Sequence, residues 1–180
     1  MIKINTRNGS ITGKSKNGIY SFLGIPYGQP PVGGKRFRAP EAHGPWSGTL
    51  DGATPGNRAM QPQAPVGQAW VEQSSEDCLF LNIYTPASDA RARPVLFWIH
   101  GGGWSSGASS NGTYDGFGFA DKGVVLVSVN YRMNAFGFMA HPALSAESER
   151  SVSGNYGILD HVAALEWVRD NIAAFGGDPT

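Results

Sequence analysis

A run of five apolar residues followed almost at once by three glycines is the feature that most constrains the fold of this chain. The run is Val95–Ile99, which lies between Pro94 and His100 and is rich in β-branched and aromatic residues. An apolar run without alternation is typical of a strand buried on both faces, as in sheets covered by helices. Two similar runs, Leu79–Tyr84 and Val124–Val129, predict further strands of the same sheet.

A helical pattern follows these strands between Tyr156 and Phe175. Its apolar residues recur every three or four positions, which predicts a helix with one stripe packed on a sheet. The stripe comprises Ile158, Val162, Leu165, Val168, Ile172 and Phe175. Gly176-Gly177-Asp178-Pro179 supplies the glycine stop and trailing proline of a helix end. Strands followed by a crossover helix predict an α/β layered fold with a mostly parallel sheet.

The first 25 residues predict an antiparallel meander that leads into this sheet. Short apolar segments alternate there with the turn pairs Asn8-Gly9 and Asn17-Gly18. From Pro26 to Gln73, prolines and glycines interrupt any periodicity, and we expect a long loop of the kind that forms lids or rims. We expect residues 1–180 to be the N-terminal part of a single domain, because the helix should return the chain to a further parallel strand.

Composition and charge exclude several classes of function. Lys and Arg together number 14 and balance 14 Asp and Glu, and charged residues are only 16% of the chain, so we expect no nucleic-acid partner. Cys78 is the sole cysteine, which excludes an internal disulfide and a thiolate zinc cluster. The chain has neither a signal-peptide pattern nor a run of about 18 apolar residues, so we expect no membrane partner and a cytoplasmic location. We expect no cofactor.

The glycines of His100-Gly101-Gly102-Gly103 place unobstructed backbone N–H groups after a strand, at the edge where open α/β sheets bind ligands. Such donors can stabilise an oxyanion, and His-Gly-Gly-Gly is a known oxyanion-hole segment of lipases and esterases. A flexible turn and a phosphate-binding loop are the alternatives. No lysine follows the glycines, which argues against a nucleotide-binding phosphate loop.

Ser105 lies in Gly103-Trp104-Ser105-Ser106-Gly107, which formally matches the G-x-S-x-G nucleophile elbow. The elbow requires its serine on a sharp turn between a strand and a helix. Here the predicted strand has already ended at Ile99, and residues 108–112 are turn-rich rather than helical. We therefore expect Ser105 to line the rim of the site and not to act as the nucleophile.

The four histidines are expected to be structural. His100 should orient the glycine loop through a hydrogen bond, His161 lies on the predicted helix, and His43 and His141 lie in loops. No two of them have the i, i+4 helical spacing of a metal site, so the sequence predicts no metal.

Ordered motifs run along the whole chain. They are Phe22-Leu23-Gly24-Ile25-Pro26-Tyr27, Arg36-Phe37, Ser75-Glu76-Asp77-Cys78-Leu79-Phe80-Leu81-Asn82, the glycine segment after His100, Asn130-Tyr131-Arg132, Gly154–Asp160, Ala164–Val168 and Gly176-Gly177-Asp178-Pro179. In order and spacing they resemble the type-B carboxylesterase family, which includes the cholinesterases and bacterial para-nitrobenzyl esterases. The resemblance implies an α/β-hydrolase fold and the hydrolysis of carboxylic esters through an acyl-serine intermediate.

The resemblance also implies roles for individual residues. Gly102 and Gly103 would supply two N–H groups of the oxyanion hole. The residues implied to bind or border the substrate are Gly101, Trp104, Ser106 and Tyr131. Arg36 and Glu76 match a structural ion pair of the family.

The same resemblance implies what residues 1–180 lack. In the family the nucleophile elbow follows the Gly-Gly-Asp-Pro motif closely, so the catalytic serine, acid and histidine are all expected outside this chain. We therefore expect a partner in the remainder of the catalytic domain, on the same polypeptide or on a second chain, and no activity from residues 1–180 alone. Cys78 matches a half-cystine of many members, but its partner position falls in Ala59-Met60-Gln61. This departure fits a reducing compartment.

The alternatives to an esterase are a non-catalytic binding or adhesion protein of the same fold, and an inactive fragment without a triad. The intact glycine segment favours the enzyme. The sequence does not identify the ester, although Trp104 with Phe117, Phe119, Phe136 and Phe138 could form an aromatic wall beside it.

Overall fold

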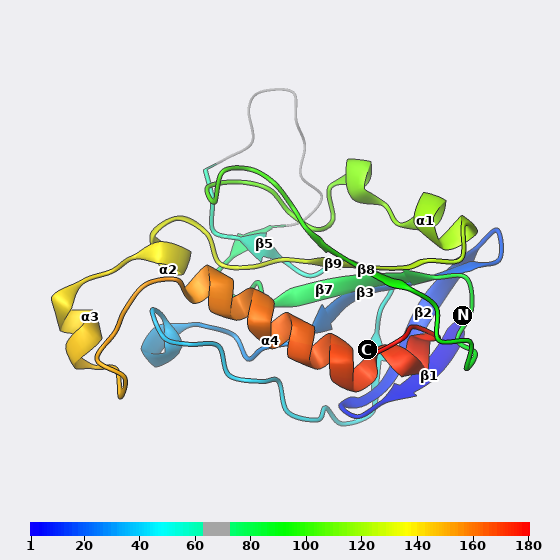
Figure 1. Cartoon of the computed structure of the whole chain (residues 1–180), viewed down its shortest axis with the longest axis horizontal. Coiled ribbons are helices and arrows are strands. Elements are labelled where there is room, and N and C mark those ends of the chain that lie inside the picture. The colour runs from blue at the N-terminus through cyan, green and yellow to red at the C-terminus, as the bar shows by residue number, and fades with distance from the viewer. Residues whose placement is uncertain (63–72) are drawn as a thin grey trace.

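A computed structural model describes residues 1–62 and 73–180. Figure 1 shows a mixed sheet with strands β7, β8 and β9 lying between helix α4 and helix α1. The strands are β1 (Ile2–Thr6), β2 (Gly9–Lys16), β3 (Ile19–Pro26), β4 (Thr49–Asp51), β5 (Arg58–Ala59), β6 (Ser74–Ser75), β7 (Phe80–Thr85), β8 (Val95–Ile99) and β9 (Val125–Val129). The helices are α1 (Phe117–Asp121), α2 (Asn134–Phe138), α3 (Pro142–Ala146) and α4 (Tyr156–Asn171). Short 3₁₀ turns are η1 (Gly33–Lys35), η2 (Gly112–Tyr114) and η3 (Ile172–Phe175).

The main sheet has the strand order β1-β2-β3-β7-β9-β8, and β4 pairs in parallel with β2 outside this path. The predicted meander is confirmed, since β1, β2 and β3 pair antiparallel in succession. Among the long strands described, the predicted parallel pairing occurs between β8 and β9. Strand β7 pairs antiparallel with both β3 and β9. All five residues of β9 are buried, which confirms the expectation for that strand.

Strand β8 differs from the prediction of a strand buried on both faces. It lies at the edge of the described sheet, where Trp98 and Ile99 keep 37% and 40% of their surface exposed. Only β9 among the described strands pairs with β8, so its other edge and its carboxyl end remain open.

Helix α4 packs on the sheet, but not with the whole stripe that the sequence predicts. Val168, Ile172 and Phe175 enter the core as expected, and Phe175 contacts Phe22 with ring centroids 5.1 Å apart. Ile158, Val162 and Leu165 instead remain 39%, 47% and 47% exposed. The side of α4 that faces the protein carries Tyr156, Asp160, His161, Ala164 and Trp167.

Polar partners explain why α4 turns that side inward. Asp160 is fully buried and forms an ion pair with Arg132, which follows β9, at 2.6 Å between Nη2 and Oδ1. The backbone N–H of Arg132 also donates to Asp160 Oδ2 at 2.9 Å. Because a buried carboxylate must be paired, this contact fixes the rotation of the helix.

The far end of α4 is tied to the first strands. Asn171 Oδ1 accepts the backbone N–H of Arg7 at 2.9 Å, and its Nδ2 donates to Asn8 Oδ1 at 3.2 Å and to Trp167 O at 2.9 Å. Gly176 ends η3 in the left-handed region at φ 78°, which confirms the predicted glycine stop.

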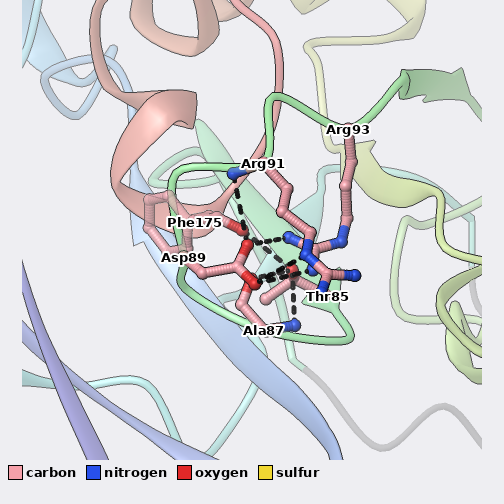
Figure 2. Close-up of polar contacts among 6 residues, drawn as sticks. All are labelled: Thr85, Ala87, Asp89, Arg91, Arg93 and Phe175. Atoms are coloured by element: carbon pink, nitrogen blue, oxygen red, sulfur yellow. Dashed lines mark hydrogen bonds and ion pairs between the residues drawn. The ribbon is translucent and has the colours of Figure 1, made fainter.

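A polar clamp closes the loop between β7 and β8 onto the end of η3 (Figure 2). The Thr85 hydroxyl lies 2.8 Å from the carbonyl oxygens of both Ala87 and Phe175 and shares its proton between them. Arg93 pairs with Asp89, with Nη2 3.0 Å from Oδ2. The backbone of Arg93 donates to Gly176 O at 2.9 Å and accepts from Asp178 N at 2.7 Å, so both backbone polar groups before β8 are paired.

The long segment predicted as loop contains only short elements in its described part. Strand β4 joins the meander, β5 pairs with β6, and the Trp46 indole N–H donates to Ser10 O at 2.9 Å, which holds the segment against β2. Residues 63–72 of the predicted loop, Trp70 included, lie outside the described residues.

Candidate active site

The glycine loop, which comprises residues 100–109, leaves the carboxyl end of β8 and turns back on itself. Gly102 O accepts the backbone N–H groups of Ser105 at 3.1 Å and Ser106 at 3.2 Å. Gly102 has φ 126°, and a Cβ placed on it would lie 1.8 Å from Ser106 O, so the turn requires glycine there. Gly103 also has a positive φ, 61°, and a Cβ placed on it would meet no atom within 4 Å.

The turn leaves backbone donors without partners. Within the described part of the chain, the N–H groups of Gly102 and Gly103 donate no hydrogen bond. Two adjacent unpaired donors at the carboxyl end of a strand can bind a developing negative charge on an oxygen atom. The assignment of these glycines to an oxyanion hole stays a prediction, which this geometry suits.

Tyr131 and His100 lie beneath the loop. The Tyr131 hydroxyl donates to His100 O at 3.1 Å, and the two rings stack with centroids 4.6 Å apart. His100 Nδ1 lies 2.9 Å from Gly101 O, and because a carbonyl only accepts, Nδ1 carries the proton. The predicted hydrogen bond from His100 to the glycine loop is therefore present.

The aromatic layer continues to α4. His161 contacts the Tyr131 ring edge-on at 4.4 Å between centroids and lies 6.2 Å from the Trp104 ring. Burial lowers the pKa of both His100 and His161 and raises the pKa of Tyr131, so all three groups are neutral near pH 7. Nε2 of each histidine is buried without a hydrogen-bond partner in the described structure.

A hollow opens above this layer. It is lined by Gly103, Trp104, Ser105, Asn134, Phe138, Asn155 and Ile158. Of the residues expected to border the substrate, Trp104 lines the hollow, whereas Gly101, Ser106 and Tyr131 do not.

The predicted aromatic wall assembles only in part. Phe138 meets Trp104 edge-on at 5.1 Å between ring centroids. Phe117 packs instead on Tyr84, Phe136 stacks on Phe37, and Phe119 is 47% exposed. The apolar side of the hollow therefore rests on Trp104, Phe138 and Ile158.

Ser105 lies in a turn rather than in an elbow. Its hydroxyl donates to Gly102 O at 3.0 Å, and the next regular element is the 3₁₀ turn η2, preceded by Asn111 as its N-cap. Within the described residues its hydroxyl has no histidine partner, so nothing there would activate it as a nucleophile.

The remaining histidines lie away from the loop. His43 contacts Gly44 O, and His141 accepts the Ala143 N–H at the start of α3. In the described part of the chain, no group of three or more His, Cys, Asp or Glu side chains could hold a metal ion.

The Arg36–Glu76 pair that the resemblance implies is present, with Nη2 2.6 Å from Oε1. Cys78 is a free, buried cysteine, and burial raises the pKa of its thiol. Ala59 and Met60, from the segment in which the resemblance places a disulfide partner, line the same small hollow as Cys78.

Two side-chain amides hold the glycine loop, and sequence reasoning missed both. Gln61 and Asn134 bond backbone atoms of Gly107 and Ser105, which lie 46 and 29 positions away in the chain. Neither amide belongs to a chemical motif, and no local spacing could have indicated these contacts.

Comparison with known proteins gives a consistent result. A model of the carboxylesterase family matches residues 1–180. Fumonisin B1 esterase of Sphingopyxis macrogoltabida is 46% identical over 180 residues, and para-nitrobenzyl esterase of Bacillus subtilis (strain 168) is 43% identical over 179 residues. These alignments cover 97% and 98% of this chain but only 32% and 36% of the relatives.

Solved structures agree. A carboxylesterase of Geobacillus stearothermophilus matches with a TM-score of 0.90 and 47% identity, and a PNB esterase with a TM-score of 0.88 and 41% identity. Each match covers 98% of this chain and 36% of the solved chain. The expected fold class is therefore confirmed: the chain has the α/β-hydrolase fold of these proteins and spans about a third of their length.

Proposed function

Because this chain belongs to the carboxylesterase family, we propose that it forms the N-terminal part of a serine esterase that hydrolyses carboxylic esters. The observation that carries the proposal is the pair of N–H groups at Gly102 and Gly103, which have no partner among the described residues. They lie beside a hollow with an apolar side, which suits the carbonyl and hydrocarbon parts of an ester.

The mechanism proposed for the complete protein is acyl transfer. A serine Oγ attacks the ester carbonyl carbon while a histidine takes the hydroxyl proton. The carbonyl oxygen becomes an oxyanion, which the N–H groups of Gly102 and Gly103 bind. Collapse of this intermediate expels the alcohol, which takes the proton from the histidine. Water then releases the carboxylic acid from the acyl-serine.

The serine, acid and histidine come from the remainder of the catalytic domain in this proposal. Trp104 borders the substrate directly, whereas Gly101 and Ser106 shape the turn beside it, and Tyr131 supports its floor. The relatives act on esters as different as para-nitrobenzyl esters and fumonisin B1 by their names, so the proposal stays at the class of carboxylic esters.

The same proposal treats residues 1–180 as part of one catalytic domain in a cytoplasmic protein. The free, buried thiol of Cys78 supports a reducing compartment. In the described part of the chain, the helices are too short or too polar to span a membrane.

The test removes one oxyanion donor and leaves every side chain unchanged. In the complete polypeptide, glycolic acid in place of Gly103 turns the backbone N–H into an ester oxygen. We expect kcat for a para-nitrophenyl ester to fall about a hundredfold or more, as for other oxyanion donors. The matched control is the same replacement at Gly101, whose N–H also has no partner among the described residues and is not assigned to the hole.

If the protein with glycolic acid at position 103 and the protein with glycolic acid at position 101 have equal kcat, Gly103 does not belong to the oxyanion hole. A complete polypeptide that shows no burst of nitrophenol and no covalent labelling by a fluorophosphonate would instead support the non-catalytic binding protein.

A further inference from the structure

The glycine loop has an anchor at its far end. Ser109 is buried, its backbone N–H donates to Asn130 Oδ1 at 2.7 Å, and its carbonyl accepts from Ser128 Oγ at 3.2 Å. Between the end of β8 and this anchor the backbone passes through left-handed positions at Gly102, Gly103, Trp104 and Gly107. Glycine-rich backbone is conformationally permissive, so contacts from outside the loop must define one conformation.

Gln61 supplies the first of these contacts. Its Nε2 donates to Gly107 O at 2.8 Å, and its Oε1 accepts the Gly107 N–H at 2.9 Å. The side chain therefore pairs with one residue as a neighbouring strand would. A Cβ on Gly107 would lie 2.4 Å from His100 Nδ1, so Gly107 is held between Gln61 and the histidine under the loop.

Gln61 is itself fixed to the small β5–β6 sheet. The same Nε2 donates to Ala59 O at 3.0 Å, and the Gln61 backbone N–H donates to Ser74 Oγ at 3.2 Å. Ser74 Oγ in turn donates to Ala59 O at 2.9 Å. The contact to Gly107 thus connects the loop to a second ordered part of the protein.

Asn134 supplies the second set of contacts. Its backbone N–H donates to Trp104 O at 2.8 Å, and its Nδ2 donates to Ser105 O at 3.0 Å and Met60 O at 3.1 Å. Asn134 has φ 54°, a conformation that asparagine tolerates better than most residues. It therefore joins α2, the residue before Gln61 and the turn that contains Gly103.

We propose that Gln61 and Asn134 are positioning residues that hold the donors of Gly102 and Gly103 at the oxyanion. The inference rests on the proposed function and adds residues to it. The side-chain amides bond Ser105 and Gly107, and the backbone N–H of Asn134 bonds Trp104 O. These contacts leave the N–H groups of Gly102 and Gly103 to the substrate. An oxyanion donor acts only within hydrogen-bond distance, and a displacement of 1 Å costs about a hundredfold in rate.

The experiment measures kcat, KM and inhibition by a trifluoromethyl ketone in the complete polypeptide. Gln61→Met keeps the length of the side chain but removes its hydrogen bonds. Asn134→Gly accepts the positive φ and removes the side-chain amide only. For each variant we expect kcat to fall about ten- to a hundredfold, KM to stay within about threefold, and the inhibition constant to rise in step with the loss of kcat.

The matched control is Asn171→Leu. Asn171 also forms three hydrogen bonds through its amide, but to Arg7, Asn8 and Trp167 at the far end of α4. We expect this variant to lower the melting temperature while kcat and the inhibition constant stay near wild type.

Gln61→Glu adds a readout that a purely structural role would not change. A protonated carboxylic acid offers one donor and one acceptor as an amide does, whereas the carboxylate offers only acceptors toward Gly107 O. We expect the ratio of variant to wild-type kcat to rise as the pH is lowered.

Three outcomes decide the inference. It is overturned if both loop variants lose stability as Asn171→Leu does but keep kcat within about threefold of wild type. The inference is overturned, while the proposed function stands, if glycolic acid in place of Gly103 lowers kcat but Gln61→Met and Asn134→Gly do not. A wild-type polypeptide without ester turnover overturns both proposals.

Discussion

The two ends of strand β8 are held in opposite ways. At the amino end, the backbone N–H and carbonyl groups of Arg93 are both hydrogen-bonded. The Thr85 hydroxyl donates to Phe175 O, as Figure 2 shows. At the carboxyl end, the N–H groups of Gly102 and Gly103 have no partner among the described residues. One strand thus ends in a closed clamp on one side and in open donors on the other.

This difference shows where the chain can leave polar groups unpaired. Buried polar groups without partners destabilise a fold, so the clamp stabilises the joint between β7, β8 and η3. Open donors are tolerated beside a hollow where water or substrate can reach them. Changes at the amino end should therefore affect stability, and changes at the carboxyl end should affect turnover.

The largest expected effect comes from Gly102→Ala. The new Cβ would lie 1.8 Å from Ser106 O, so the turn must open and move the adjacent donors. We expect kcat/KM of the complete polypeptide to fall at least about a hundredfold. Gly18→Ala is the control, because Gly18 has a similarly positive φ of 79° with open space around it in a distant hairpin. If kcat/KM of Gly102→Ala stays within a few-fold of that of Gly18→Ala, the carboxyl end of β8 does not control turnover.

The next effect is at the clamp. Thr85→Val keeps the shape of a fully buried side chain but removes the hydroxyl from Phe175 O. We expect a loss of about 1–3 kcal/mol in the free energy of unfolding, with kcat unchanged. Urea unfolding measures this loss, and Thr85→Ser, which keeps the hydroxyl, should retain more of the hydrogen-bond contribution. A fall in kcat without loss of stability would assign the clamp to the site.

The smallest effect is on the pH dependence of stability, through the two histidines near the carboxyl end of β8. Burial lowers the pKa of His100 and His161 in the folded protein, while the unfolded chain titrates near about 6.5. Below that pH the unfolded chain binds protons first, so stability is complete above about pH 6.5 and falls on acidification. The slope is at most about 1.4 kcal/mol per pH unit for each histidine.

His161→Gln removes one of the two histidines, so the free energy of unfolding should fall less steeply as the pH is lowered. Urea midpoints at pH 5, 6 and 7 measure it for the variant and the wild type. Two titratable groups lie nearby. Burial, and then the charge of His161, lowers the pKa of His100, and the phenol of Tyr131 is neutral over this range. Parallel curves for the two proteins would show that His161 does not titrate in this window.

The sequence predicts the strands well because their apolar runs are continuous. Strands β7 and β9 begin within one residue of the expected positions, and β8 agrees at both ends. The glycine loop is also located correctly, since three glycines directly after an apolar run mark the end of the strand.

The orientation of α4 could not be predicted from the spacing of its apolar residues. Asp160 and His161 face inward because Arg132 and Tyr131 meet them there, and a hydrophobic pattern assigns polar residues to the opposite face. The amides of Gln61 and Asn134 escape prediction for a related reason. Their partners lie in distant segments, so only the folded chain brings them together.

The tie between Asn171 and Arg7 has a consequence for synthesis on the ribosome. The two residues are 164 positions apart, so Arg7, directly after β1, acquires this partner only after almost all of the 180 residues have been made. At about 5–20 residues per second, the delay is on the order of 10–30 s. During that interval Phe22 of the N-terminal hairpins lacks the Phe175 ring that packs against it in the folded chain.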